Sequence, residues 1–237
     1  MPSKTELAIA GFYDGIYLFY GAANSFLTFG LDLYWRRRAA GLALRLAPGA
    51  RTALDACCGT GDFTLALKKK FGPGLLLAGA DLSEAMLSSA RARLPGAKFT
   101  AAAAGELPFP DGSFDLVTIS FATRNLNIDR EKLLAALREF RRVLKPGGVF
   151  LNLETTRPEN RLVWFLMRVY VKSAIGLLNL LSPKSRAPYL FLLNTILGFY
   201  SAPEFSALLA EAGFEAVSAK PLFPGAVAAH SARRPAN

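Results

Sequence analysis

The sequence predicts an α/β fold in which a doubly wound, largely parallel sheet of seven strands is flanked by helices. Short apolar segments alternate with segments of helical periodicity between residues 51 and 156, which is the pattern of βαβ units. Acidic residues or glycines follow the first two apolar segments, at the strand ends where ligands of such sheets bind. The chain's 237 residues suffice for one large domain with a sizeable core.

Five strands of the predicted sheet are apolar runs, and they span residues 52–56, 75–80, 97–102, 114–121 and 149–154. The helices between them repeat apolar residues every three or four positions, and they span residues 62–71, 83–94 and 130–144. Ser83 is suited to cap the second of these helices, because its hydroxyl can accept an N–H of the first turn. Lys145-Pro146-Gly147-Gly148 is a stop signal for the third.

Segments on either side of this core complete a single domain of residues 1–237. Residues 1–50 are predicted to form aromatic-rich helices, and residues 157–200 a helical insertion before the last helix. Residues 201–237 are predicted to hold that helix, over 203–214, and the last two strands, around 215–220 and 226–231. No internal repeat or low-complexity linker interrupts the layout.

Charge and cysteine content restrict the class of protein. The net charge of +10 indicates an anionic partner. The two cysteines, Cys57 and Cys58, are adjacent; this argues against a disulfide or a zinc site and favours a reducing, cytoplasmic compartment. The N-terminus lacks the pattern of a secretory signal. The apolar run 162–181 is interrupted by Arg168 and Lys172, so a spanning helix is not predicted.

The stretch Leu54–Asp62, LDACCGTGD, is the candidate ligand loop. A dinucleotide fold would place a third glycine where this chain has Thr64, and Asp62 would repel a phosphate at the helix N-terminus. An acid there favours a cationic ligand, such as an ammonium or a sulfonium. Asp81 could accept the hydroxyls of a ribose. The D-x-x-x-G-x-G pattern resembles the S-adenosylmethionine loop of Rossmann-like methyltransferases.

Longer stretches resemble one family, the ubiquinone/menaquinone biosynthesis C-methyltransferases. The similarity covers nearly the whole chain, and its most specific parts are the tract from Tyr20 to Trp35 and the S-F-x-x-R-N segment from Ser120 to Asn125. The similar stretches are YDGIYLFYGAANSFLTFGLDLYWRRR (13–38), LDACCGTGD, ELPFPDGSFDLVTISFATRN (106–125), RVLKPGG (142–148), LETTRPEN (153–160) and SAPEFSALLAEAGF (201–214).

The resemblance implies a metal-free enzyme that uses S-adenosylmethionine to methylate a ring carbon of a polyprenylated quinol. It implies that residues 1–50 cover the substrate. The implied catalytic residues are Arg124, Asn125 and Tyr20, and the implied substrate residues are Asn24 and Tyr189. The implied cofactor-binding residues are Asp55, Gly59, Thr60, Gly61, Asp62, Asp81, Leu82, Ala103, Ala104 and Ser120.

Arg124 suits this chemistry because a cation can stabilise the phenolate that makes the ring carbon nucleophilic. An arginine is effectively always protonated, so it is not expected to act as the base itself. The chain departs from the family's usual residues at three places: Gly21, Ala103 and the segment 189–196, which has lost two charges. His230, the one histidine, is expected to be structural.

Arg157, Arg161, Arg168 and Lys172 are spaced so that a single helix would align them in one stripe. Aromatic and aliphatic residues lie between them, which is typical of a helix in the interface of an anionic membrane. The enzyme is therefore expected at the inner face of the membrane, peripherally bound. The alternative is a helix that packs on the domain and exposes its arginines to solvent. The sequence also leaves open whether the protein forms a homodimer.

Other functions fit the residues less well. A nucleic-acid methyltransferase would use the positive charge, but the segment after the fourth strand is SFATRN and not the N/D-P-P-Y/F type of base amino-methylases; no nucleic acid is therefore expected as a partner. A small-molecule O- or N-methyltransferase on the same fold stays open. So does a non-catalytic scaffold that binds the cofactor within a quinone-synthesis assembly. The missing third glycine argues against a nicotinamide dehydrogenase.

Overall fold

The computed structural model describes residue 11, residues 27–181 and residues 186–236. Seven strands form one sheet in the order β3-β2-β1-β4-β5-β7-β6. Neighbouring strands are parallel from β3 to β5, while β7 runs antiparallel to both β5 and β6. The strands are β1 (Thr52–Ala56), β2 (Leu76–Asp81), β3 (Lys98–Ala101), β4 (Phe114–Ser120), β5 (Leu144–Thr155), β6 (Glu215–Phe223) and β7 (Val227–Arg233). This topology confirms the predicted fold class.

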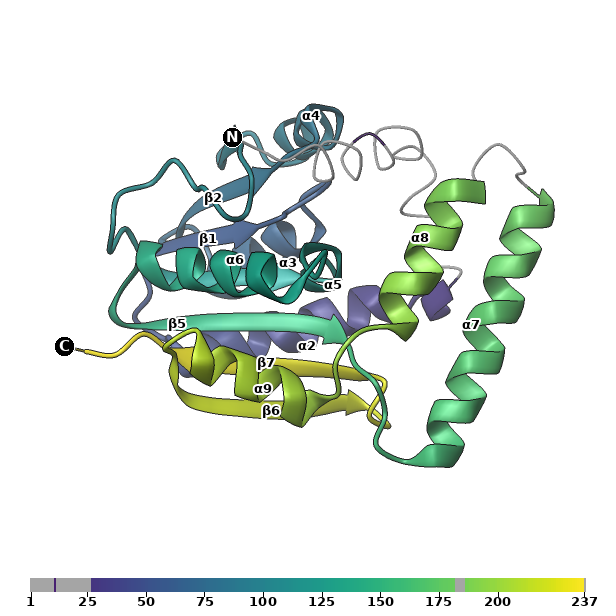
Figure 1. The fold of residues 1–237 in the computed structure, drawn as a ribbon. Coiled ribbons are helices and arrows are strands. Elements are labelled where there is room, and N and C mark those ends of the chain that lie inside the picture. The colour runs from purple at the N-terminus through teal and green to yellow at the C-terminus, as the bar shows by residue number, and fades with distance from the viewer. Residues whose placement is uncertain (1–10, 12–26, 182–185, 237) are drawn as a thin grey trace.

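Helices cover both faces of the sheet (Figure 1). Some of them begin at capping residues, such as Ser83, whose hydroxyl accepts the N–H of Met86 at 3.2 Å. The helices are α2 (Leu31–Leu46), α3 (Asp62–Phe71), α4 (Glu84–Arg93), α5 (Thr123–Leu126), α6 (Arg130–Val143), α7 (Arg161–Leu181), α8 (Arg186–Leu197) and α9 (Ala202–Glu211).

Two hydrophobic cores lie on opposite faces of this sheet. α6 and α9 cover the face toward the viewer in Figure 1, where Phe140, Phe150 and Phe205 are fully buried. α2 and α3 cover the far face, where Trp35 and Phe63 pack against the strands. Because both faces are covered, the strand ends are the places left for a ligand.

The insertion between β5 and α9 forms a helix pair beside the carboxyl ends of the strands (Figure 1). α7 and α8 pack together through a separate small core that includes Val171, Ile175 and Leu192. The Tyr170 hydroxyl donates to the carbonyl of Leu27 at 3.0 Å, so α7 also contacts the segment that precedes α2. The insertion is thereby joined to the N-terminal side of the domain.

Two local predictions differ from the structure. The helix before the stop signal ends at Val143, close to the predicted end, but the strand that follows is longer than predicted: β5 begins at Leu144, includes the stop signal and pairs with β4 through an irregular register. The segment after β4, for which no element was predicted, forms a short helix, α5. Arg157 does not lie on the insertion helix as predicted, because α7 begins only at Arg161 and Arg157 pairs with Glu204 of α9.

Candidate active site

The glycine loop after β1 turns sharply and approaches the end of β2. Gly59 and Gly61 have φ angles of 54° and 80°, a conformation that strongly favours glycine. The N–H of Gly59 donates to Asp81 Oδ2 at 2.8 Å. A Cβ at Gly61 would lie 3.3 Å from the Ala90 side chain of α4. The two glycines therefore let the loop turn, and the second also lets α4 pack closely.

Asp81 is held in a defined orientation at the end of β2. Its Oδ1 accepts the N–H of Ser83 at 3.0 Å, while its Oδ2 accepts the N–H of Gly59. The residue is only partly buried and lines the pocket above the loop. A carboxylate fixed by two backbone N–H groups and open to the pocket can accept hydroxyl hydrogen bonds from a ribose.

This glycine-loop pocket lies at the carboxyl ends of β1, β2 and β4. The structure brings together here eight of the predicted cofactor and catalytic residues: Gly59, Thr60, Asp62, Asp81, Leu82, Ala104, Ser120 and Asn125. The other lining residues were not predicted as site residues: Arg36, Cys57, Cys58, Phe63, Ser83, Met86, Ala102, Phe121, Ala122 and Leu126. Asp55, Gly61 and Ala103 lie beside the pocket, outside its lining. Ala102 takes the lining position next to Ala104.

Asp55 lies buried beneath the loop and joins three elements. The hydroxyl of Thr64 on α3 donates to Asp55 Oδ2 at 2.6 Å, and that of Thr118 on β4 donates to Oδ1 at 3.0 Å. Burial raises the pKa of Asp55 to about 6, although both threonines and the charge of Arg36 act to lower it. The role that this geometry supports is to fix the loop from below.

Asp62, in the first turn of α3, lies at the rim of the pocket and already has two polar partners. Its Oδ1 pairs with Arg93 Nη2 of α4 at 2.7 Å, and its Oδ2 accepts the hydroxyl of Thr60 at 3.2 Å. Arg93 also donates to the carbonyl of Thr60 at 2.9 Å. Both members of the ion pair are partly exposed, so a cationic ligand could still be attracted to Asp62.

Both cysteines line the pocket, and Cys58 is not a reactive thiol. Burial raises the pKa of the Cys58 thiol well above its usual value, and the neighbouring carboxylates of Asp81 and Asp55 raise it further. A thiol that stays protonated is a poor nucleophile. Cys57 adopts a positive φ of 50° at the start of the turn. Both cysteines therefore serve as small side chains beside the loop.

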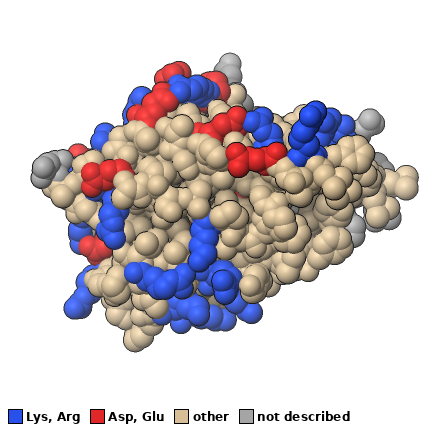
Figure 2. Space-filling model, turned by 90° about the horizontal axis from the view of Figure 1, so that it is seen from below, with Lys and Arg blue, Asp and Glu red and all other residues tan. Residues whose placement is uncertain are grey.

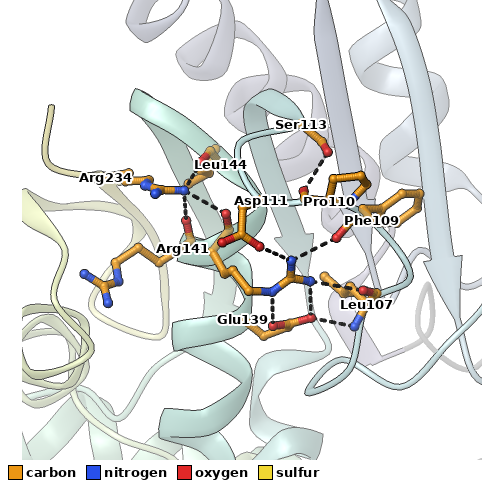
Figure 3. Close-up of polar contacts among 10 residues, drawn as sticks. Leu107, Phe109, Pro110, Asp111, Ser113, Glu139, Arg141, Leu144 and Arg234 are labelled. Atoms are coloured by element: carbon orange, nitrogen blue, oxygen red, sulfur yellow. Dashed lines mark hydrogen bonds and ion pairs between the residues drawn. The ribbon is translucent and has the colours of Figure 1, made fainter. Parts of the chain in front are cut away.

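The loop that carries Ala104 is pinned to α6 by a charged network (Figure 3). Arg142 makes two hydrogen bonds of 2.7 Å to Glu139 and donates to the carbonyls of Phe109 and Leu107. Glu139 in turn accepts the N–H of Leu107 at 2.7 Å. Arg142 also pairs with Asp111 at 2.5 Å. This network holds the loop beside the pocket in one conformation.

Arg124 lies on α5 and is anchored from behind by a residue that the sequence analysis missed. Its Nη1 pairs with Glu154 Oε1 at 2.7 Å and donates to the carbonyl of Phe121 at 2.7 Å. Its backbone N–H donates to Glu154 Oε2 at 3.2 Å. Arg124 is 4% exposed and Glu154 fully buried. Glu154 ends an apolar strand at the ligand-binding edge, a position that could have revealed it.

A second pocket begins on the other side of α5. It is apolar, has a volume of about 430 Å³, and extends between α2, α7, α8 and the turn from β6 to β7. Phe121 lines both pockets, Arg124 lines the apolar one and Asn125 lines the glycine-loop pocket. The remaining lining residues include Trp35, Met167, Tyr170, Val171, Leu192 and Ile196. The predicted Arg-Asn pair thus stands between two cavities of different chemistry.

The other predicted residues lie elsewhere. Tyr189 is 5% exposed and packs in the core between α7 and α8, outside the lining of both pockets. Tyr20, Gly21 and Asn24 lie outside the described residues. His230 is buried, with Nε2 3.1 Å from the carbonyl of Ala202, and burial lowers its pKa to about 4. Within the described residues, no cluster of His, Cys, Asp or Glu is arranged to hold a metal ion.

S-adenosylmethionine fits the glycine-loop pocket. Asp81 offers a fixed carboxylate for a ribose, and Leu82, Ala102 and Ala104 form an apolar wall beside it. Asp62 offers a negative charge for the cationic groups. Arg36 offers a buried guanidinium whose Nε has no hydrogen-bond partner among the described residues.

Sequence comparisons point to one family. Residues 1–234 match the model of the ubiE/COQ5 methyltransferase family. A demethylmenaquinone methyltransferase of Thermus thermophilus is 40% identical over 91% of this chain and 96% of the relative. One of Bacillus licheniformis is 35% identical over 97% of this chain and 98% of the relative.

Structure comparisons agree on the fold. An S-adenosylmethionine-dependent methyltransferase of Thermotoga maritima superposes with a TM-score of 0.67 at 23% identity, covering 95% of this chain and 99% of the other. Phosphoethanolamine N-methyltransferase 2 of Haemonchus contortus, in complex with S-adenosylmethionine, superposes with a TM-score of 0.59 at 16% identity. That match covers 84% of this chain and 52% of the other.

Proposed function

Because the chain belongs to the ubiE/COQ5 methyltransferase family, we propose that it methylates a ring carbon of demethylmenaquinol, a polyprenylated naphthoquinol, and yields menaquinol. The family and the fold make it an S-adenosylmethionine-dependent methyltransferase, as the sequence predicts. The relatives at 35–40% identity are named demethylmenaquinone methyltransferases, which favours the naphthoquinol over a benzoquinol of ubiquinone synthesis.

The observation that carries the proposal is the meeting of two unlike pockets at α5. One pocket has the carboxylates and glycines that suit a polar, cationic cofactor. The other is almost entirely apolar, with a volume of about 430 Å³, which suits a quinol ring and the first part of its prenyl chain. Arg124, Asn125 and Phe121 lie where the two meet, so the reacting atoms would come together there.

The residues at this junction can direct a carbon methylation. Bound S-adenosylmethionine supplies an electrophilic methyl group on its sulfonium. Arg124 places a fixed positive charge in the wall of the apolar pocket, where it would lower the pKa of a quinol hydroxyl and stabilise the phenolate. Glu154 orients that guanidinium through its Oε1. Phe121, shared by both pockets, would keep the ring in place, and this alignment supplies much of the rate.

Methyl transfer from labelled S-adenosylmethionine tests the proposal. Reduced demethylmenaquinone and a demethylated ubiquinol precursor would be compared as acceptors. We expect label in the naphthoquinone product, and a loss of about 100-fold in kcat for Arg124→Ala, the typical effect of removing one preorganised group that stabilises an anion. Arg130→Ala is the matched control, because Arg130 is exposed and pairs with Glu211 on the surface.

Two results would contradict the proposal. Label in a small phenol or amine and in neither quinol would indicate an O- or N-methyltransferase. Cofactor binding without turnover of either quinol would favour a non-catalytic scaffold. Calorimetric binding of S-adenosylhomocysteine to each variant separates these results from misfolding.

We further propose that α7 holds the enzyme on the inner face of an anionic membrane. Its outward side chains are unusually apolar, with Leu162 65% exposed and Leu180 76% exposed. Phe165, Leu166 and Val169 are exposed on the same side. The right-hand side of Figure 2, where α7 lies in Figure 1, is largely uncharged and borders a group of Lys and Arg side chains. Leu166 also lines the apolar pocket, so substrate could enter from the bilayer.

Three basic residues accompany this apolar face. Arg161, Arg168 and Lys172 are exposed on α7, and their spacing keeps them on one side of the helix. Among the described residues, α7 is the helix long and apolar enough to cross a membrane. Its inner face packs against α8 through Val171 and Ile175, which favours a helix lying along the surface.

Co-sedimentation with vesicles tests the membrane proposal. Arg168→Glu/Lys172→Glu should bind anionic vesicles at least about thirtyfold more weakly, at about 1 kcal/mol for each basic residue lost near the surface. Lys69→Glu/Lys70→Glu changes the same charge on exposed residues of α3 and should bind normally. Equal binding of both double variants would refute the role of α7.

A further inference from the structure

We infer that Arg36 is a cofactor-binding residue whose guanidinium holds the carboxylate of the methionyl part of S-adenosylmethionine. Arg36 belongs to the run Arg36-Arg37-Arg38 on α2, where it resembles an ordinary surface arginine. In the fold it differs from its neighbours. It is 6% exposed and lines the glycine-loop pocket, while Arg37 and Arg38 are exposed.

The charge distribution in the pocket calls for such a residue. S-adenosylmethionine carries a sulfonium, an ammonium and a carboxylate. The pocket lining offers Asp62 and Asp81 to the cationic and hydroxyl groups. Among the described lining residues, Arg36 is the one with a positive charge. Burying a carboxylate without a cationic partner is strongly unfavourable, so Arg36 is the group that can receive it.

The position of Arg36 matches the amino-acid end of the cofactor. Asp81 and Leu82 mark the ribose and adenine end, beyond β2. Arg36 lies at the other end, beyond β4, with its guanidinium carbon 5.0 Å from the centre of the Phe121 ring. β1 separates β2 from β4 in the sheet. A cofactor lying across these strand ends with its adenine near Leu82 would therefore bring its carboxylate toward Arg36.

The Arg36 guanidinium pairs with Asp32 on one side and has N–H donors left for a second anion. Arg36 Nη1 pairs with Asp32 Oδ2 at 2.5 Å, and both side chains are 7% exposed. This bond leaves Nε buried without a hydrogen-bond partner among the described residues. A guanidinium has five N–H donors in a rigid fork that matches a carboxylate. Asp32 fixes its orientation from one side, and the Phe121 ring restricts it from another.

Calorimetry with two ligands tests the inference. S-adenosylhomocysteine carries the carboxylate, and its α-carboxamide keeps the ammonium and the adenosine but is neutral at that position. The wild type should bind the carboxamide about tenfold to a hundredfold more weakly, the usual range for a hydrogen bond to a charged group. Arg36→Gln should bind S-adenosylhomocysteine weaker by the same factor and the carboxamide about as the wild type does. Arg37→Gln is the matched control.

The inference is overturned if Arg36→Gln weakens both ligands equally, since Arg36 would then only shape the pocket. It is also overturned if S-adenosylhomocysteine binds the variant as it binds the wild type. Because Arg36→Gln leaves Asp32 buried and unpaired, Asp32→Asn/Arg36→Gln repeats the comparison with neither charge present. The inference rests on the use of S-adenosylmethionine and not on the identity of the quinol. A wild type that binds neither ligand would refute the proposed function itself.

Discussion

The glycine-loop pocket and the apolar pocket meet at α5, but the chain builds them in different ways. The first is assembled from short segments at strand ends, in which single residues carry the function: Gly59 turns the backbone, Asp81 accepts N–H groups, and Ser83 caps α4. The second is assembled from the sides of α2, α7 and α8 and from the turn between β6 and β7. No short motif defines it.

The difference shows where each pocket gets its specificity. In the glycine-loop pocket, hydrogen bonds and charges fix the positions of individual atoms, so losing one group costs a great deal. In the apolar pocket, many side chains each contribute a small part of the binding free energy through apolar contacts. A single substitution therefore removes only a small part of it. The two pockets should therefore respond very differently to substitution.

The largest effect is expected for Asp81→Asn. An amide cannot accept from both Gly59 and Ser83, and it loses the charge that would bind the ribose hydroxyls. We expect S-adenosylhomocysteine to bind about a hundredfold to a thousandfold more weakly, as for two hydrogen bonds to a charged group. Binding of a short-chain quinone, followed by quenching of Trp35 in the apolar pocket, should be unchanged. If Asp81→Asn weakened both ligands equally, the pockets would not be independent.

A smaller effect is expected from the pH dependence of two buried groups. The pKa of Asp55 is raised from 3.8 to about 6 by burial. Between these values the folded protein binds more protons on Asp55 than the unfolded chain does, so this group stabilises the fold as pH falls from 7 to 4. The pKa of His230 is lowered from 6.5 to about 4 by burial. The unfolded chain then binds more protons, so this group destabilises the fold over nearly the same range.

The two contributions oppose each other, at about 2–3 kcal/mol each for shifts of this size. Wild-type stability should therefore change little from these groups between pH 7 and 4. Asp55→Asn should lose stability on acidification more steeply than the wild type, and His230→Gln should lose less or gain. Urea unfolding at pH 4, 5, 6 and 7 measures this. Parallel curves for the wild type and both variants would contradict the assignment.

Much of the glycine-loop pocket was readable from the sequence, because its residues occupy positions that physical rules identify. Asp81 ends an apolar strand, Ser83 precedes a helical pattern, and Gly59 stands where the chain must turn. Arg36 was not readable, because three successive arginines resemble a solvated helix face. Only the fold shows that one of the three points inward, and the Asp32 partner four residues earlier was the available signal.

The apolar pocket was not readable for a different reason. Met167, Val171 and Ile196 have the spacing of ordinary core residues, and a hydrophobic side chain that lines a cavity has the same pattern as one that fills it. Whether a gap remains depends on how α7 and α8 settle against α2 and the β6–β7 turn. Glu154 could be singled out by its place near the end of an apolar strand, but its pairing with Arg124, 30 residues away, could not, because that pairing depends on β4 lying next to β5.

The smallest effect is expected when a substitution partly fills the apolar pocket. This variant tests the comparison of the two pockets by changing the apolar one alone. Met167 lines this pocket and is partly exposed, so Met167→Trp can project its ring into the cavity at little cost in folding. We expect kcat/KM for a long-chain quinol to fall only about tenfold, the effect of one disturbed apolar contact of 1–3 kcal/mol. A short-chain quinol should be affected less, because its tail does not reach the filled part. S-adenosylhomocysteine should bind Met167→Trp as tightly as it binds the wild type. Asn194→Trp, on the exposed side of α8, should have the kcat/KM of the wild type.

An equal loss of kcat/KM for both chain lengths would mean that the cavity holds the ring alone. The prenyl chain would then have to leave the pocket beside α5.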